Sequence, residues 1–355
     1  MRGKTPETLG YKMPAEWDRH EATWLCWPQN SEDWPGKFAP IQWVYAEIVK
    51  KISAGEIVRI LVGSKEKELQ ARRALTKAYV DLTRVEFVRL ATDRGWTRDS
   101  GPIFVTKNGR KPESAIVDFG FNAWAKYPNW KKDRKIPAFA AKRLGVKLFN
   151  AEVNGKPFTV EGGAIDVNGT GTLITTEECL LDQKTQVRNH GLSREDTEKA
   201  LRDYLGITNV LWLNKGIAGD DTHGHVDDLC RFINQNTLVI CREKNTSDEN
   251  HTLLEENIER LQDMRLEDGS KPEVVHLPMP EPLWFDGMRL PASYANFYIC
   301  NAAVIAPTFN DPADRVALGI LAELFNDRKV VGISAVDLVW GLVTLHCLTQ
   351  QQPAV

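Results

Sequence analysis

The densest group of reactive side chains lies over residues 220–228, where the sequence reads Asp-Asp-Thr-His-Gly-His-Val-Asp-Asp. In an extended chain, alternate side chains point to the same face, so a strand here would place four polar groups on one face. These groups are Asp221, His223, His225 and Asp227. Imidazole and carboxylate together suit acid–base catalysis, and they are also ligands for zinc or iron. A solvated acidic turn is a further interpretation, although the stretch runs directly into the apolar residues 229–233.

A second reactive group is Cys347, within the segment Thr-Leu-His-Cys-Leu-Thr-Gln-Gln-Gln-Pro over residues 344–353. A free cysteine usually behaves as a small buried apolar side chain. Here its neighbours are His346 and a polar tail, so the residues alone leave both a structural and a nucleophilic role open. The six cysteines form no Cys-x-x-Cys pair, which favours reduced thiols over a disulfide framework.

Short strand-like segments that carry unusual polar residues recur along the chain at spacings of roughly 50–70 residues. A ring of similar strand–helix units, each delivering a polar group to a common centre, would produce such a pattern. The segments are 96–105 with Asp99, 160–167 with Glu161, 224–233 with His225 and Asp227, 293–302 with Asn296, and 342–350 with Cys347.

The motifs in these segments, taken in order, resemble the agmatine deiminase and bacterial peptidylarginine deiminase family. The resemblance runs from about residue 13 to residue 353, nearly the whole chain. The motifs that carry it are Met-Pro-Ala-Glu-Trp-Asp-Arg-His-Glu-Ala-Thr-Trp-Leu-Cys-Trp-Pro (13–28), Trp-Thr-Arg-Asp-Ser-Gly-Pro (96–102), Glu-Gly-Gly (161–163), Leu-Ile-Thr-Thr-Glu-Glu-Cys-Leu-Leu (173–181), Gly-His-Val-Asp (224–227), Ala-Ser-Tyr-Ala-Asn-Phe-Tyr (292–298) and His-Cys-Leu-Thr-Gln-Gln-Gln-Pro (346–353).

The resemblance implies an α/β fold, a five-bladed propeller (pentein) with pseudo-fivefold symmetry, formed by residues 1–355 as a single domain with the active site at the central axis. It implies that Cys347 is the nucleophile and His225 the general acid and base. Asp99 and Asp227 would hold the guanidinium nitrogens through paired charge-assisted hydrogen bonds. No metal or other cofactor is expected for this reaction.

Five further residues are expected to contact the substrate or to support those contacts. Trp96 would offer an indole face to the cation, with a core tryptophan as the equally weighted alternative. Glu161 and Asn296 are expected near the centre, as direct contacts or as supports. Asp221 is a candidate partner for the free amine of agmatine, and His223 is expected beside it.

Two stretches depart from the family pattern. Typical agmatine deiminases read Glu-Thr-Asp-Gly-His where this chain has Asp-Thr-His-Gly-His (221–225), and Gly-Gly-Gly-Asn-Ile-His-Cys where it has Gly-Leu-Val-Thr-Leu-His-Cys (341–347), preceded by Trp340. Both lie beside the catalytic candidates without replacing them. They therefore bear on substrate identity more than on reaction class.

The preferred function is hydrolysis of agmatine to N-carbamoylputrescine and ammonia, a step towards putrescine in polyamine metabolism. A deiminase that converts free or peptidyl arginine to citrulline is the first alternative. A metal-dependent amidohydrolase that uses His223 and His225, and a non-catalytic guanidinium-binding protein, are the others.

The elements that must position these groups alternate between short apolar strands and amphipathic helices, without a low-complexity linker. The Ser-Arg-Glu-Asp sequence at residue 193 is typical of a helix start. Strands are predicted over 56–62, 85–90, 171–176 and 237–241, and helices over 43–52, 66–80, 193–205, 250–264 and 313–325.

Composition restricts the partners. The net charge is −3, without a long run of one sign, which argues against nucleic acid or an anionic membrane surface. No apolar stretch approaches the length of about 18 residues that a membrane span requires, and the N-terminal residues 1–17 do not resemble a signal peptide. We expect a cytoplasmic protein whose partner is a small cationic guanidino compound, and the sequence leaves open whether it forms a homo-oligomer.

Overall fold

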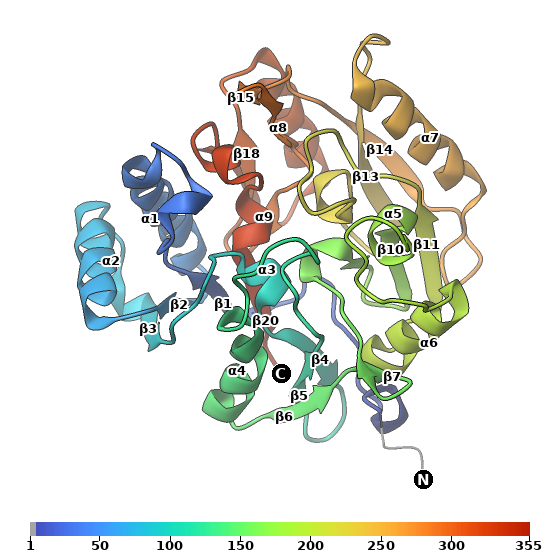
Figure 1. The fold of residues 1–355 in the computed structure, drawn as a ribbon, viewed down its shortest axis with the longest axis horizontal. Coiled ribbons are helices and arrows are strands. Elements are labelled where there is room, and N and C mark those ends of the chain that lie inside the picture. Colours follow the sequence, from blue (N-terminus) through green and yellow to red (C-terminus); the bar gives the residue numbers. More distant parts are fainter. Residues whose placement is uncertain (1–4) are drawn as a thin grey trace.

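The computed structural model describes residues 5–355, so the first four residues of the N-terminal stretch discussed above lie outside the described residues. The predicted α/β class is confirmed, because strands and helices alternate along the chain (Figure 1). The predicted strands are β2 (Ile57–Val62), β3 (Val85–Arg89), β10 (Thr172–Thr176) and β13 (Thr237–Arg242). The predicted helices are α1 (Phe38–Ser53), α2 (Lys65–Lys77), α6 (Arg194–Leu205), α7 (Glu249–Asp263) and α8 (Pro312–Leu324).

Helix boundaries follow from local chemistry. Helix α6 begins with a capping box in which Ser193 and Asp196 each accept a hydrogen bond from the other's backbone N–H, as the sequence predicts. Helix α1 begins five residues before the predicted start, because Pro40 falls in its first turn, where the missing N–H has no intrahelical partner to lose.

Five sheets share one plan. In each, the first two strands are antiparallel, and the next strand pairs parallel to the second after a connection that contains a helix. The sheets are β4 (Ile103–Lys107), β5 (Glu113–Asp118) and β6 (Lys147–Asn150); β9 (Asp166–Val167), β10 and β11 (Asn209–Leu213); β12 (Cys230–Phe232), β13 and β14 (Glu273–Pro278); β17 (Tyr298–Ile299), β18 (Ala303–Thr308) and β19 (Lys329–Ser334); and β20 (Thr349–Pro353), β1 (His20–Cys26), β2 and β3.

The fifth of these sheets joins the two ends of the described chain. Strand β20 from the C-terminal segment pairs antiparallel with β1 from the N-terminal segment, with Thr349 opposite Leu25. This pairing fixes the position of Cys347, which lies two residues before β20. Two small hairpins complete the strands: β7 (Glu152–Val153) with β8 (Lys156–Pro157), and β15 (Trp284–Phe285) with β16 (Met288–Arg289).

A short helical turn precedes the first strand in four of the five sheets. These turns are α3 (Thr97–Ser100), the 3-10 helix η5 (Gly162–Ala164), the 3-10 helix η6 (Val226–Asp228) and α9 (Leu345–Leu348). Figure 1 shows α3 and α9 near the middle of the ribbon, whereas α1, α2, α4 (Ile136–Leu144), α6, α7 and α8 lie towards its periphery. The plan of the fold therefore places the polar residues of the turns at the centre.

Residues 221–225 are not extended. Residues 221–224 form a turn and a bend, no strand includes residues 221–225, and η6 follows, so the alternation expected for a strand does not apply. His223 has a left-handed backbone with φ of 66°, which turns its side chain away from the direction that a strand would give it. Among the helices of residues 5–355, none has the length and apolar character needed to cross a bilayer.

Candidate active site

Cys347 is fully buried in α9 and lies beside a carboxylate and an amide. Its Sγ atom is 3.5 Å from Asp227 Oδ2, and it accepts a hydrogen bond from Asn296 Nδ2 at 3.2 Å. Asn296 in turn accepts hydrogen bonds through Oδ1 from the Thr344 hydroxyl at 2.7 Å and the His346 backbone at 3.0 Å. Asn296 therefore connects the thiol to the loop that leads into α9, and holds that loop in place.

His225 is the N-cap of η6, and its ring is completely enclosed. Its Nδ1 atom lies 3.8 Å from Asp99 Oδ1, and its Nε2 atom lies 3.6 Å from Glu161 Oε2. Neither nitrogen has a hydrogen-bond partner within residues 5–355, and the same holds for Asp227 Oδ1. Buried polar atoms are nearly always paired, so these unpaired atoms mark a place where a polar ligand fits.

Polar atoms of Asp99, His225 and Asp227 converge over Gly163, where only a residue without a side chain fits. A Cβ atom on this glycine would come within 2.6 Å of His225 Nδ1, 2.9 Å of Asp99 Oδ1 and 3.0 Å of Asp227 Oδ2. The backbone N–H of Gly163 donates to Asp99 Oδ1 at 3.0 Å, and the Trp124 indole donates to Asp99 Oδ2 at 2.9 Å. We call the space bounded by Asp99, Gly163, His225 and Asp227 the cradle.

Charges around the cradle are strongly coupled. Burial raises the pKa of Asp99 to about 6, although the charge of His225 opposes the shift. Burial would also raise the pKa of Glu161, but the Arg188 guanidinium at 3.0 Å and the neighbouring His225 together outweigh burial and lower that pKa to about 2. Burial alone would depress the pKa of His225, yet the neighbouring Asp99 and Glu161 raise it well above its usual value. The imidazole is therefore a proton donor at neutral pH.

The surroundings of Cys347 favour its neutral, protonated form. Burial, together with the charges of Asp227, Asp228 and Asp99, raises the pKa of Cys347 well above its ordinary value. A cation placed in the cradle would offset the charges of Asp99 and Asp227 and so favour the thiolate.

A pocket of about 580 Å³ lies next to the cradle. Trp124 lines this pocket and also donates to Asp99, so the pocket and the cradle share a wall. Trp96 and Asp221 line the pocket as well. Trp96 packs against Trp34 with ring centroids 5.2 Å apart, so it is a core residue that also faces the pocket.

The side chains of Asp221 and His223 point to different partners in the structure. Asp221 accepts hydrogen bonds from Lys126 Nζ at 2.5 Å and from the Tyr127 hydroxyl at 2.6 Å. His223 lies outside the residues that line the pocket, with Nε2 at 2.8 Å from Asp182 Oδ2. The structure therefore does not bring the rings of His223 and His225 to one metal ion in the way that the amidohydrolase alternative requires.

The second departure from the family pattern forms part of the pocket wall. Trp340, Gly341, Leu342 and Val343 all line the pocket, and Trp340 stacks on Phe285 with centroids 3.7 Å apart. The hairpin β15–β16 is thereby held against the pocket rim. This segment shapes the pocket without touching Cys347 Sγ.

Four residues at the centre were not predicted to have a role in the site. His346 lies between two carboxylates, with Nδ1 at 2.6 Å from Asp227 and Nε2 at 2.7 Å from Glu16. Arg188 pairs with Glu161, and Cys179 lies close to both Glu161 and His225. Glu16, Cys179 and His346 fall inside the motifs that carry the family resemblance, which is the signal that could have drawn attention to them.

A buried thiol, an imidazole and converging carboxylates are the groups that displacement of a nitrogen from an amidine carbon requires. The class is that of hydrolases acting on the C–N bonds of linear amidines. The profile of the Porphyromonas-type peptidyl-arginine deiminase family matches residues 12–353. The chain belongs to this family.

Relatives cover the whole chain. The agmatine deiminase of Stutzerimonas stutzeri (strain A1501) is 37% identical over 373 aligned residues, which cover 99% of this chain and 97% of the relative. The agmatine deiminase of Pseudomonas aeruginosa (strain LESB58) is 35% identical with the same coverage. The solved structure of the Enterococcus faecalis agmatine deiminase superposes with a TM-score of 0.89 at 30% identity, covering 99% of this chain and 98% of that one.

Proposed function

We propose that this chain hydrolyses the guanidinium group of agmatine to give N-carbamoylputrescine and ammonia. The observation that carries the proposal is the cradle, where Asp99 Oδ1, Asp227 Oδ2 and His225 Nδ1 all converge over Gly163, so closely that a side chain on this residue would meet all three. The full-length relatives named agmatine deiminase support the choice of substrate.

The two carboxylates are the binding groups of the proposal. A guanidinium ion is planar and carries its N–H donors in a fixed fork, so two carboxylates can hold it by charge-assisted hydrogen bonds. Their charges keep the substrate cation in place, and the cation in turn lowers the cost of ionising Cys347. The indoles of Trp96 and Trp124, which line the adjoining pocket, offer apolar faces to the methylene chain.

Cys347 and His225 carry the covalent steps. The Cys347 thiolate attacks the guanidinium carbon, and a tetrahedral adduct forms on sulfur. His225 donates a proton to the departing nitrogen, and ammonia leaves an amidino-thioether on Cys347. A water molecule, deprotonated by His225, then hydrolyses this intermediate to the ureido product and restores the thiol.

Asn296 and Glu161 act as supports in this scheme. Asn296 donates to Cys347 and anchors the loop before α9, so it fixes the direction of the sulfur lone pairs. Glu161, held ionised by Arg188, stabilises the protonated form of His225. His223 supports the Asp221 loop from outside through its pair with Asp182.

The finer architecture is part of the proposal. The five sheets of one plan, each led by a segment that brings a polar residue to the site, support a five-bladed α/β propeller with the cradle on its pseudo-fivefold axis. All six cysteines are free and buried, which supports a reducing, cytoplasmic environment for a single-domain enzyme.

The deciding experiment measures ammonia release from agmatine, from arginine and from a blocked arginyl peptide, each with and without iodoacetamide. We expect release from agmatine that alkylation abolishes. Cys347→Ala should abolish turnover, whereas the matched variant Cys300→Ala, which replaces another buried thiol, should retain it. Full activity of the Cys347→Ala enzyme would refute the nucleophile.

Arginine or an arginyl peptide is the second candidate, and one feature of the pocket favours it. Arg94 lines the pocket, and Lys126 lies at its edge on Asp221, so cations are available to a substrate carboxylate. Turnover of arginine or the peptide without turnover of agmatine would keep the mechanism and replace the substrate.

A further inference from the structure

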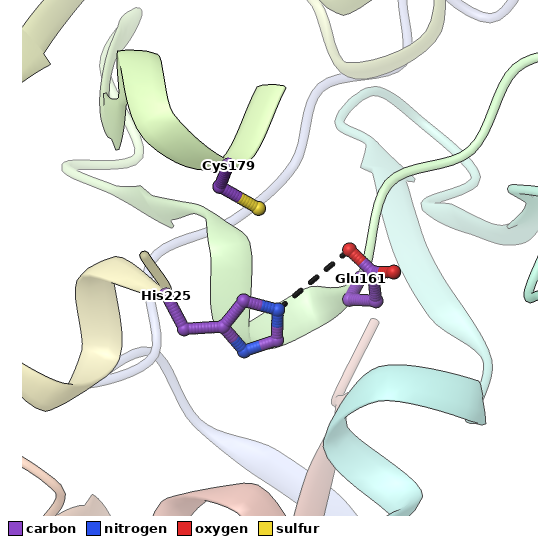
Figure 2. A group of neighbouring side chains, drawn as sticks. All are labelled: Glu161, Cys179 and His225. Carbon is purple, nitrogen blue, oxygen red and sulfur yellow. Dashed lines mark ion pairs between the residues drawn. The ribbon is translucent and has the colours of Figure 1, made fainter. Parts of the chain in front are cut away.

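A second cysteine lies next to the catalytic imidazole. Glu161, Cys179 and His225 come from η5's N-cap, α5 (Glu177–Leu180) and η6's N-cap, and their side chains point towards one another in Figure 2. One ligand atom from each, among them Cys179 Sγ, lies within 4.8 Å of the others, and all three residues are buried. The proposed deiminase chemistry uses no thiol at this position.

The arrangement matches what a thiophilic divalent cation requires. Zn²⁺ prefers tetrahedral sites built from thiolate, imidazole and carboxylate, with three protein ligands when one position stays open. Bonds of about 2.0–2.2 Å at tetrahedral angles separate a nitrogen and an oxygen ligand by about 3.4 Å. His225 Nε2 and Glu161 Oε2 are 3.6 Å apart, so these two ligands already have the required spacing.

The ring nitrogen that the metal needs is held by no other group of the protein and becomes a ligand once its proton is released. His225 Nε2 is buried and has no hydrogen-bond partner within the described chain. Glu161 also has the outer support typical of ligating carboxylates, because Arg188 donates to Oε1 at 3.0 Å and to Oε2 at the longer distance of 3.3 Å.

Surrounding charges decide whether a cation is tolerated beside Arg188. Asp99 Oδ1 lies 3.8 Å from the other ring nitrogen of His225, and Asp227 borders the same cradle. With Glu161 and the Cys179 thiolate, four negative groups then oppose one guanidinium. The field at this position therefore favours a divalent cation.

We propose that Glu161, Cys179 and His225 form an inhibitory Zn²⁺ site that withdraws the imidazole from catalysis without engaging the nucleophile. On binding, Cys179 and the protonated His225 each release one proton to solvent, and the resulting thiolate and the Nε2 lone pair form the Zn–S and Zn–N bonds. The bound ion keeps His225 from carrying a proton on that nitrogen and repels a cationic substrate from the cradle.

A neighbouring group is the main rival for the metal. Asp227, Asp228 and Cys347 also have ligand atoms within 4.8 Å of one another. There, however, Asp227 Oδ2 is engaged by His346 at 2.6 Å and Cys347 Sγ by Asn296 at 3.2 Å. The Glu161–Cys179–His225 group has fewer bonds to break, and the test must separate the two.

The experiment titrates Co²⁺, a spectroscopic substitute for Zn²⁺, into the full-length Cys347→Ala protein and follows sulfur-to-cobalt charge-transfer absorption. We expect this absorption at one Co²⁺ per chain and its displacement by Zn²⁺. Adding Cys179→Ser should abolish it and weaken Zn²⁺ binding by more than about tenfold, as loss of metal-site residues does. Adding Cys300→Ala instead should leave it unchanged.

An absent band in the Cys347→Ala protein, or a band that survives addition of Cys179→Ser, would overturn the proposal. Because this titration needs no turnover, its result is independent of the proposed function. In an enzyme that retains Cys347, Cys179→Ser should raise the Zn²⁺ concentration for half-inhibition by more than about tenfold. An unchanged value would assign the inhibition to Cys347 and contradict the proposal.

Discussion

Asp99 and Glu161 are both buried carboxylates beside the same imidazole, yet their pKa values move in opposite directions. Asp99 has neutral donors, the Trp124 indole and the Gly163 backbone, so burial dominates and raises its pKa to about 6. Glu161 has Arg188 at 3.0 Å, and the guanidinium together with His225 outweighs the effect of burial on its pKa. Asp99 therefore titrates close to neutral pH, whereas Glu161 stays ionised.

A pH profile tests the role of Asp99. Binding needs the ionised carboxylate, so kcat/KM for agmatine should rise as pH increases through about 6, the raised pKa of Asp99 in the free enzyme. Asp33 is the rival, because burial raises its pKa to about 7 and it also lines the pocket. The acid limb should persist in Asp33→Asn. Its disappearance in that variant would assign the limb to Asp33.

Asp221 and Lys126 test recognition of the free amine. Lys126 Nζ donates to Asp221, the carboxylate that we propose as the partner of the ammonium group of agmatine. Asp221→Asn should raise KM for agmatine by roughly tenfold or more, the worth of a hydrogen bond to a charged group, and Lys126→Met should lower it. Neither should change KM for n-butylguanidine, which lacks the amine. Equal changes for both compounds would exclude Asp221 as the amine partner.

Most of the polar residues at the centre lie on or next to short helical turns, and the long helices carry none of them. The turns α3, η5, η6 and α9 have three or four residues each, and no more than two residues separate each turn from the strand that follows. Too short to be stable alone, they are held by the strands that follow and by contacts across the centre. Such a turn can carry a polar residue into the centre and leave the long helices for the periphery, as Figure 1 shows.

Gly163→Ala tests the cradle at the level of η5. The added methyl group would lie 2.6–3.0 Å from His225, Asp99 and Asp227, so it should displace the substrate cation and lower kcat/KM by more than about a hundredfold, as misplacement by about 1 Å does.

Gly319→Ala in α8 is the matched control for that substitution. No atom lies within 4 Å of its added methyl group, and alanine should raise helix stability by about 0.5–1 kcal/mol without affecting turnover. Wild-type kinetics in Gly163→Ala would show that the guanidinium binds elsewhere.

At the scale of the whole molecule, Glu16 connects several sheet units, although it lies outside all five sheets. Its carboxylate accepts from the Ile299 backbone at 2.8 Å and from His346 Nε2 at 2.7 Å, and it pairs with Arg98 at 3.1 Å and Arg231 at 3.0 Å. These partners belong to four different sheet units. One buried anion from the N-terminal segment therefore fixes the centre of the molecule.

Glu16→Gln should destabilise the fold by about 3–5 kcal/mol in urea unfolding, because it leaves the buried Arg98 without an anionic partner and Arg231 with Asp166 alone. Burial would raise the pKa of Glu16, but Arg231, His346 and Arg98 lower it well below its usual value. Its contribution is therefore present above the unfolded pKa of about 4.3 and is lost as pH falls further.

Glu47→Gln is the matched control for Glu16. It breaks an exposed pair with Lys51 one helical turn away and should cost less than about 0.5 kcal/mol. Similar losses in the two variants would mean that the charge of Glu16 does not hold the centre together.

Local chemistry in the sequence was enough to predict the periodic elements. Short apolar segments predicted four strands to within one residue, and the Ser193 capping box fixed the start of α6. These features depend on neighbours a few residues away, so they can be predicted from the sequence without knowledge of the tertiary structure. The family motifs likewise pointed to Cys347, His225, Asp99 and Asp227 as one set.

Only the tertiary structure decided which residues meet. The expected face of Asp221, His223, His225 and Asp227 does not form, because the left-handed His223 breaks the alternation and sends its ring to Asp182. Conversely, Cys179 comes to His225 and Glu16 comes to His346 across long stretches of chain, where spacing in the sequence carries no information. The charge state of each buried group depends on these long-range neighbours, so it too could be known only from the folded chain.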